Sequence, residues 1–239
     1  RRLVDHTADF NLVYTQHARR NLLGEGIHPR RILLTGSPML EVLGLYREAI
    51  DASDALAELG VTPREYFLVS AHREENVDNP ERLEQLVASL NAVATRWGLP
   101  VLVSTHPRTR KRLEAGDAVE VDPLVRFHPP FGFLDYNKLQ LESACVLSDS
   151  GTIAEESTML GFPAVTLRGA IERPEALDTG AITMVDVAAN TVVAGVEFAM
   201  ARGRSPEAPE DYRIENTSER VVNFILSTQP QHKQWSGLR

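Results

Sequence analysis

Short apolar runs alternate with amphipathic segments along most of the chain. The runs are apolar at nearly every position instead of at every second one, which is typical of strands covered on both faces. Strands that alternate with helices imply right-handed crossovers and a parallel sheet. The pattern therefore predicts an α/β fold, with strands at 66–70, 100–105, 124–128, 144–148, 163–167 and 181–185.

The segment between the first two predicted strands has the spacing of an amphipathic helix. Leucine, valine, alanine and tryptophan recur there at helical intervals. Asn79 can cap this helix, Pro80 suits its first turn and Gly98 suits its end. Together with the strands, this helix predicts one doubly wound α/β domain over residues 39–205.

The two ends of the chain show a different pattern. Residues 1–38 contain a short predicted strand at 10–16 and a short helix at 17–26, followed by turn residues. We interpret this segment as the tail end of a preceding domain and a linker. Residues 206–239 predict one more helix, at about 216–227, and a frayed tail.

Composition narrows the function classes. The chain has 239 residues and a net charge of −8, which argues against wrapping nucleic acid or binding an anionic membrane. Its longest apolar runs are far shorter than the roughly 18 residues that a membrane span needs. One cysteine, Cys145, excludes a disulfide framework and, with no visible signal peptide, predicts a cytoplasmic setting. The sequence begins with Arg1 instead of methionine, so we allow for an N-terminal portion that it does not include.

Residues that directly follow strands are the first candidates for a site, because open α/β sheets bind ligands at the carboxyl ends of their strands. His72 and Arg73 follow the first predicted strand, in the sequence AHREEN. A solvated charged loop explains them as well as an anion-binding site does. The His-x-Glu spacing also occurs in zinc deaminases, but that class is excluded because it needs two further cysteine ligands.

A second charged segment follows the strand at 100–105. His106 lies closest to the strand end, and a run of arginine and lysine comes after it. Such a basic helix start is unusual, because cations normally favour helix C-termini. We expect Lys111 and Arg112 to form a solvated basic face, which leaves His106 as the candidate.

The fourth predicted strand is followed at once by a helical pattern, in the sequence LSDSGTIAEES. The backbone amides of Ser150, Gly151 and Thr152 would lie at the helix start, where free N–H groups and the helix dipole favour phosphate. Gly151 has no side chain and would let the ligand approach closely. Glu155 fits a capping box with Thr152, which leaves Glu156 to accept hydrogen bonds from a sugar. Plain helix capping is the alternative.

Arginines and aromatic residues complete the candidates. Arg168 and Arg173 follow the fifth predicted strand, and the planar guanidinium fork suits phosphate oxygens, although ion pairs with nearby glutamates are the alternative. Tyr136 or Phe133 could stack on a flat base, but aromatic residues at helical spacing more often belong to a core. Taken together, the strand ends supply the groups that a nucleoside diphosphate sugar would need.

Five motifs occur in an order known from one family. AHREENVDNPERL, STHPRTRKRL, PFGFLDYNKLQ, LSDSGTIAEES and ERPEALDTG follow one another along nearly the whole chain. In these motifs the chain resembles the non-hydrolysing UDP-N-acetylglucosamine 2-epimerases, and two of them resemble most the branch acting on modified UDP-sugars for surface polysaccharides. The resemblance implies a glycosyltransferase-B architecture, with the active site between two Rossmann-like domains. Residues 1–38 would end the N-terminal domain, and residues 39–205 would be the C-terminal, UDP-binding one.

The resemblance also implies roles for individual residues. His72 would contact the diphosphate or assist its departure, and Arg173 would clamp the phosphates. Glu156 would hold the uridine ribose, while Tyr136 and the backbone at Phe131 would lie near the uracil. The other substrate-binding candidates, matched by motif, are Arg1, His106, Ser150, Gly151 and Thr152.

The family mechanism, as the resemblance implies it, needs no metal and no cofactor. A base removes the proton at C2 of the sugar, UDP leaves C1, and re-addition on the other face inverts C2. The carboxylates that move these protons lie mostly in the N-terminal domain, and Arg1 stands at the last position of the family's P-E-E-x-N-R motif. We therefore expect this chain to bind UDP and to have little or no epimerase activity. The resemblance also implies that the whole protein forms a homodimer.

Three other functions remain compatible with the sequence. A glycosyltransferase of the same architecture would also bind UDP on this domain, but it would transfer the sugar to an acceptor. A hydrolysing relative would release free N-acetylmannosamine and UDP. A non-catalytic UDP-sugar-binding protein would show affinity without chemistry at C2. The HREEN and ERPE motifs favour the epimerase.

Overall fold

The computed structural model divides the chain into two compact units. One unit is Arg1–Leu45 together with Ala208–Arg239, and the other is Tyr46–Glu207. Within them the structure describes residues 2–73, 76, 78–105, 120–169, 173–203 and 208–236.

The larger unit is built on a six-stranded sheet whose paired strands are all parallel. Its strands, in the order along the chain, are β3 (Phe67–Ser70), β4 (Val101–Ser104), β5 (Val125–His128), β6 (Cys145–Ser148), β7 (Ala164–Leu167) and β8 (Thr183–Val185). Each strand predicted from its continuous apolar run is therefore confirmed. In space the order is β5-β4-β3-β6-β7-β8. The strands β3 to β5 extend in one direction from the middle of the sheet, and the strands β6 to β8 extend in the other, so the topological switch point lies between β3 and β6. Ligands of doubly wound sheets bind at such a switch point.

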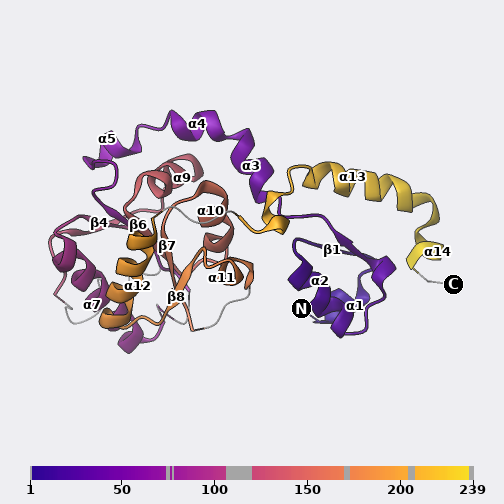
Figure 1. The fold of residues 1–239 in the computed structure, drawn as a ribbon, viewed down its shortest axis with the longest axis horizontal. Helices are drawn as coiled ribbons and strands as arrows, with labels where there is room; N and C mark the ends of the chain where they lie inside the picture. The colour runs from indigo at the N-terminus through magenta and orange to yellow at the C-terminus, as the bar shows by residue number, and fades with distance from the viewer. Residues whose placement is uncertain are drawn as a thin grey trace. The chain divides into compact units, whose positions relative to one another are not determined.

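Helices cover both faces of this sheet (Figure 1). On one face, α7 (Pro80–Trp97) and α12 (Ala189–Arg202) bury leucine, valine and alanine side chains. These side chains pack against the odd-numbered residues of β3 and β4. The opposite face is covered by a second apolar cluster. Its helices are α5 (Ala55–Leu59), α9 (Phe133–Glu142), α10 (Ile153–Leu160) and α11 (Glu175–Asp178), and α4 (Arg47–Asp51) packs against α9. With both faces covered, the polar groups at the strand ends are the natural place for a ligand.

Helix α7 forms as its sequence predicts. The Asn79 side chain accepts hydrogen bonds from the amides of Glu81 and Arg82, Pro80 occupies the first turn, and Gly98 ends the helix in the left-handed conformation. These are the residue types that best satisfy the unpaired groups at helix ends.

The smaller unit joins the two ends of the chain. Its N-terminal elements are α1 (Arg2–Thr7), β1 (Asn11–Val13), α2 (Gln16–Gly24), η1 (Pro29–Arg31), β2 (Ile32–Leu34) and α3 (Met39–Leu45). Its C-terminal elements are η2 (Glu210–Arg213), α13 (Thr217–Thr228), η3 (Gln229–Gln231) and α14 (His232–Ser236). Strands β1 and β2 pair in parallel over a small core of Val13, Leu22, Ile27 and Ile32.

Hydrogen bonds connect these two segments of the smaller unit, one of them buried and one exposed. The Thr217 hydroxyl donates to the carbonyl of Thr35 at 3.1 Å, and the Gln16 amide donates to the Asp211 carboxylate at 2.8 Å. The tail after α13 was predicted to fray, but it forms η3 and α14, and α14 packs against η1. This correction has a long-range cause, since the partner elements lie near the other end of the sequence.

In the part of the chain that the structure describes, no helix has the length and hydropathy to cross a membrane. The same residues contain no cluster of three or more histidine, cysteine or acidic side chains that could hold a metal ion. Cys145 is fully buried in β6.

Candidate functional site

The strand ends at the switch point bring two loops together. Ser70 at the end of β3 lies opposite Ser148 at the end of β6, so the residues after both strands leave the sheet side by side. The amide of Asp149 donates to the carbonyl of Ser70 at 3.1 Å. His72 therefore lies next to the start of α10, as the parallel-sheet prediction requires.

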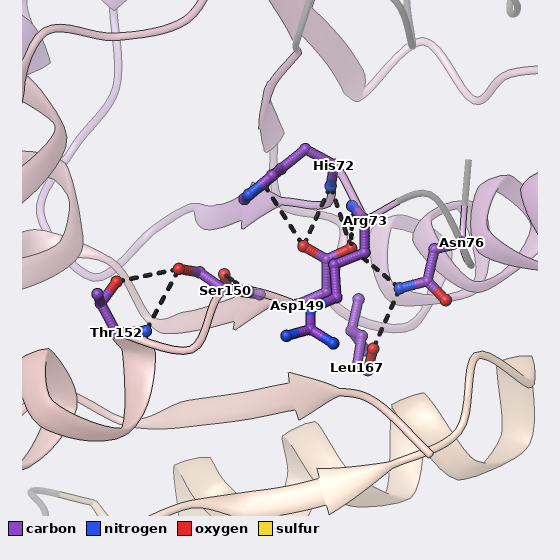
Figure 2. A network of polar contacts seen from close by, with 8 residues as sticks. His72, Arg73, Asn76, Asp149, Ser150, Thr152 and Leu167 are labelled. Carbon is purple, nitrogen blue, oxygen red and sulfur yellow. Dashed lines mark hydrogen bonds and ion pairs between the residues drawn. The ribbon is translucent and has the colours of Figure 1, made fainter. Parts of the chain in front are cut away.

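The carboxylate of Asp149 holds the loop after β3 in place (Figure 2). This side chain is fully buried, and it accepts hydrogen bonds from the amides of His72 at 3.0 Å and Arg73 at 2.9 Å. The amide side chain of Asn76 donates to it at 3.0 Å and also donates to the carbonyl of Leu167 at 3.2 Å. One buried charge thus ties together the ends of β3, β6 and β7. Neither Asp149 nor Asn76 was among the predicted site residues.

Hydroxyl groups at the start of α10 use some of the amides that were predicted to be free. The Ser150 amide donates to the Ser148 hydroxyl at 3.0 Å, and the Thr152 amide donates to the Ser150 hydroxyl at 3.3 Å. Short hydroxyl side chains commonly make such local bonds at turns. Among the described residues no acceptor is assigned to the amide of Gly151. The hydroxyls of Ser150 and Thr152 also lie 3.0 Å apart, which gives the helix start a polar rim.

Gly151 lies in open space. A Cβ atom built at this position would meet no other atom within 4 Å, and its φ is outside the left-handed region. Neither packing nor backbone conformation therefore explains a glycine here. The backbone at Gly151 is open to close approach by a ligand.

The predicted capping box between Thr152 and Glu155 is wrong. Thr152 makes no side-chain cap hydrogen bond, and the carboxylate of Glu155, which is 3% exposed, pairs with the guanidinium of Arg173 at 2.7 Å. A buried carboxylate gains more from a charged partner than from one backbone amide. Arg173 is thereby anchored beside α10. The alternative of ion pairs with nearby glutamates included Glu172, which lies outside the described residues.

Glu156 was predicted to be free, but one of its oxygens is already engaged. The side-chain amide of Gln140 on α9 donates to Oε2 of Glu156 at 2.6 Å. A carboxylate has further acceptor positions, so this bond orients Glu156 and leaves it able to bind a hydroxyl pair. Gln140 is buried and was missed by the sequence reasoning, since a helical glutamine carries no signal of its partner.

Tyr136 lies beneath the switch point. Burial, and then the negative charge of Glu156, raise the pKa of its phenol, while the side chains of Ser70 and Ser148 beside it lower the pKa. The ring contributes to the apolar cluster under α9 and α10. These contacts connect Tyr136 to the strand ends, while its predicted place near a uracil stays a prediction.

The remaining predicted residues are more scattered or fall outside the described part. Phe131 follows the edge strand β5, where its ring lies 5.4 Å from that of His128. Arg168 is buried at the end of β7, and its amide donates to Val185 on β8. Arg1 and His106 lie outside the described residues, so the structure says nothing of their side chains.

His128 makes the stability of the larger unit pH-dependent. Burial, and then the positive charge of Arg126, lower the pKa of its imidazole below its usual value of 6.5. The unfolded chain therefore binds a proton more readily, so stability is lost as the pH falls through the range just below 6.5. We expect a His128→Gln variant to lose less stability between pH 8 and pH 5.5 than the wild type, measured by thermal unfolding. An equal loss in both proteins would contradict this assignment.

The chain matches a known protein family along most of its length. A family model described as UDP-N-acetylglucosamine 2-epimerase matches residues 1–226. The chain is 34% identical to the UDP-N-acetylglucosamine 2-epimerase structure from Rickettsia bellii, with a TM-score of 0.86 over 98% of this chain and 63% of that one. The Methanocaldococcus jannaschii UDP-GlcNAc 2-epimerase, solved in complex with UDP-GlcNAc and UDP, gives 29% identity and a TM-score of 0.86 over 95% and 63%.

A curated relative acts on a modified sugar. The UDP-2,3-diacetamido-2,3-dideoxy-D-glucuronate 2-epimerase of Pseudomonas aeruginosa is 30% identical over 93% of this chain and 61% of its own length. The chain spans about 62% of the length of the first curated relatives it matches. The solved structures confirm the predicted fold class, which is α/β and glycosyltransferase-B-like. The larger unit contains the Rossmann-like parallel sheet.

Proposed function

The chain belongs to the UDP-N-acetylglucosamine 2-epimerase family, and we propose that the whole protein inverts C2 of UDP-N-acetylglucosamine or of a closely related UDP-sugar. The present chain would mainly bind UDP. The observation that carries the proposal is the switch point, where the open backbone at Gly151 lies beside the loop that bears His72. A diphosphate placed there would meet a helix N-terminus and a histidine together.

The residues at this place suit the parts of a nucleotide. The start of α10 offers the amide of Gly151 and the hydroxyls of Ser150 and Thr152 to phosphate oxygens. Arg173, which Glu155 holds beside the same helix, would add positive charge. Glu156, oriented by Gln140, would accept hydrogen bonds from the ribose. Tyr136 and Phe131 would face the uracil, and His106 and Arg1 would complete the site.

The proposed chemistry is elimination followed by re-addition. A base removes the C2 proton, its electron pair forms a double bond between C1 and C2, and UDP leaves C1 with the electron pair of the broken C1–O bond. UDP then adds back to C1 while a proton is delivered to the opposite face of C2, which gives the C2 epimer. Charge develops on the departing diphosphate, so preorganised donors lower the barrier at that point. We propose that the base lies outside this chain, in the part of the relatives that it does not span.

Proton exchange at C2 tests the proposal. The whole protein is incubated with UDP-N-acetylglucosamine in deuterated water and the reaction is followed by NMR. We expect the sugar to take up deuterium at C2 and the epimer to form. The 239-residue chain should bind UDP, measured by calorimetry, with little or no exchange. Sugar transfer that needs an acceptor would point to a glycosyltransferase, and release of free N-acetylmannosamine to a hydrolysing enzyme. UDP binding without exchange by the whole protein would indicate a non-catalytic protein.

Three finer features belong to the same proposal. The relative from Pseudomonas aeruginosa supports activity on a modified UDP-sugar of the kind used in surface polysaccharides. The single cysteine, buried and free, supports a reducing cytoplasmic setting. We also propose a homodimer, which sedimentation of the whole protein would test.

A further inference from the structure

We infer that Asp149 is a positioning residue that holds His72 toward the diphosphate. The inference rests on the proposed UDP site, because it assigns the carboxylate a task only if a phosphate group binds there. Asp149 is fully buried, and two backbone amides of the loop after β3 donate to it (Figure 2). We therefore assign its carboxylate the role of positioning His72 and Arg73, and not that of binding the ligand itself.

Burial makes this arrangement specific. A carboxylate removed from water is costly unless donors surround it. Here the donors are the amides of His72 and Arg73 and the side chain of Asn76, all within 3.1 Å of an Asp149 oxygen. Every one of them comes from the segment after β3. The charge directly after β6 consequently fixes the positions of His72, Arg73 and Asn76, which follow the neighbouring strand.

The side chain of His72 is also turned by Asp149. Its Nδ1 atom lies 3.5 Å from Oδ1 of Asp149, while 48% of the side chain is exposed. A negative charge on the Nδ1 side favours a proton on that nitrogen. The other ring nitrogen, Nε2, then lies on the side of the ring away from Asp149. The same relation between a carboxylate, an imidazole and a reacting group orients catalytic histidines in hydrolases.

Asn76 extends the support to a third strand. This buried side chain bridges the Asp149 carboxylate and the Leu167 carbonyl at the end of β7. Removing it would loosen Asp149 without removing the charge. Asn76 therefore provides a second, milder way to disturb the same support.

A double-mutant cycle on the whole protein tests the inference, with UDP affinity measured by calorimetry. Asp149→Asn keeps the shape of the side chain but presents an N–H group to donors, so we expect UDP binding to weaken about tenfold. In a His72→Ala background the same change should weaken binding less than about twofold, because the group that Asp149 positions is gone. The control Asp186→Asn alters another carboxylate that directly follows a strand, here β8, and should leave UDP affinity unchanged.

The outcomes separate the inference from the proposed function. Equal weakening by Asp149→Asn with and without His72 would mean that Asp149 only supports the fold, and the inference would be wrong. If thermal unfolding shows that Asp149→Asn does not fold, the same cycle with Asn76→Ala decides in its place. If the wild-type protein does not bind UDP at all, the proposed function fails and the inference falls with it.

Discussion

Arg173→Ala should destabilise the larger unit by about 2–4 kcal/mol, because it removes the cation that pairs with a buried carboxylate. Arg173 lies 2.7 Å from Glu155, and Glu155 is 3% exposed. Loss of the guanidinium leaves a negative charge in a place from which water is largely excluded, where less of the desolvation penalty is offset. Denaturant unfolding of the 239-residue chain, followed by circular dichroism, measures this change.

The chain contains a matched control for this experiment. Arg82 and Asp186 also lie 2.7 Å apart, but Asp186 is 61% exposed. Its carboxylate remains hydrated after Arg82→Ala, so this variant should lose no more than about 1 kcal/mol. The two substitutions differ mainly in the burial of the acidic partner. Equal losses in the two variants would show that burial of Glu155 does not govern the stability of this pair.

A second variant separates charge from contact. Glu155→Gln in the Arg173→Ala background removes the buried charge while keeping the side-chain volume. The double variant should therefore recover part of the stability that Arg173→Ala loses, which is the non-additivity expected of two groups in direct contact. A double variant less stable than either single one would contradict the ion-pair account.

The sheet was predictable because its signal is local. Strands covered on both faces are apolar at most positions, and each of the six runs predicted on this ground forms a strand of the sheet. The caps of α7 are local as well, since Asn79 and Gly98 act on neighbouring backbone groups. The strand ends then place His72 beside the start of α10 by the geometry of a doubly wound sheet alone.

The details of the site depend on contacts between residues that lie far apart in the sequence. Glu155 and Glu156 are adjacent on one helix, yet one pairs with Arg173 and the other with Gln140 on α9. Which partner each finds is decided by how α10 packs, so the capping box predicted from spacing does not form. The role of Asp149 had a usable signal, since an acidic residue that is buried directly after a strand is costly unless it accepts several hydrogen bonds.

Gly151→Asp should reduce UDP affinity about 100-fold or more while changing stability by no more than about 1 kcal/mol. The new side chain would meet no protein atom at Cβ, and an acidic residue near a helix start is favourable by about 0.3–1 kcal/mol. The nearby carboxylates of Asp149 and Glu156 offset part of that gain. For a diphosphate bound at the same helix start, two charges 4 Å apart near a protein surface repel by about 4 kcal/mol. Calorimetric titration with UDP and thermal unfolding measure the two effects separately.

Asn190→Asp is the control for charge alone. Asn190 is exposed in the first turn of α12, so the variant adds the same charge to another helix start in the same unit. Because β8 precedes that helix and lies two strands away from β6, UDP affinity should stay unchanged there. A Gly151→Asp protein that folds and binds UDP as tightly as the wild type would mean that no diphosphate lies against α10. Since the open space at Gly151 is the observation on which the UDP site depends, that result would remove the site and not merely one of its contacts.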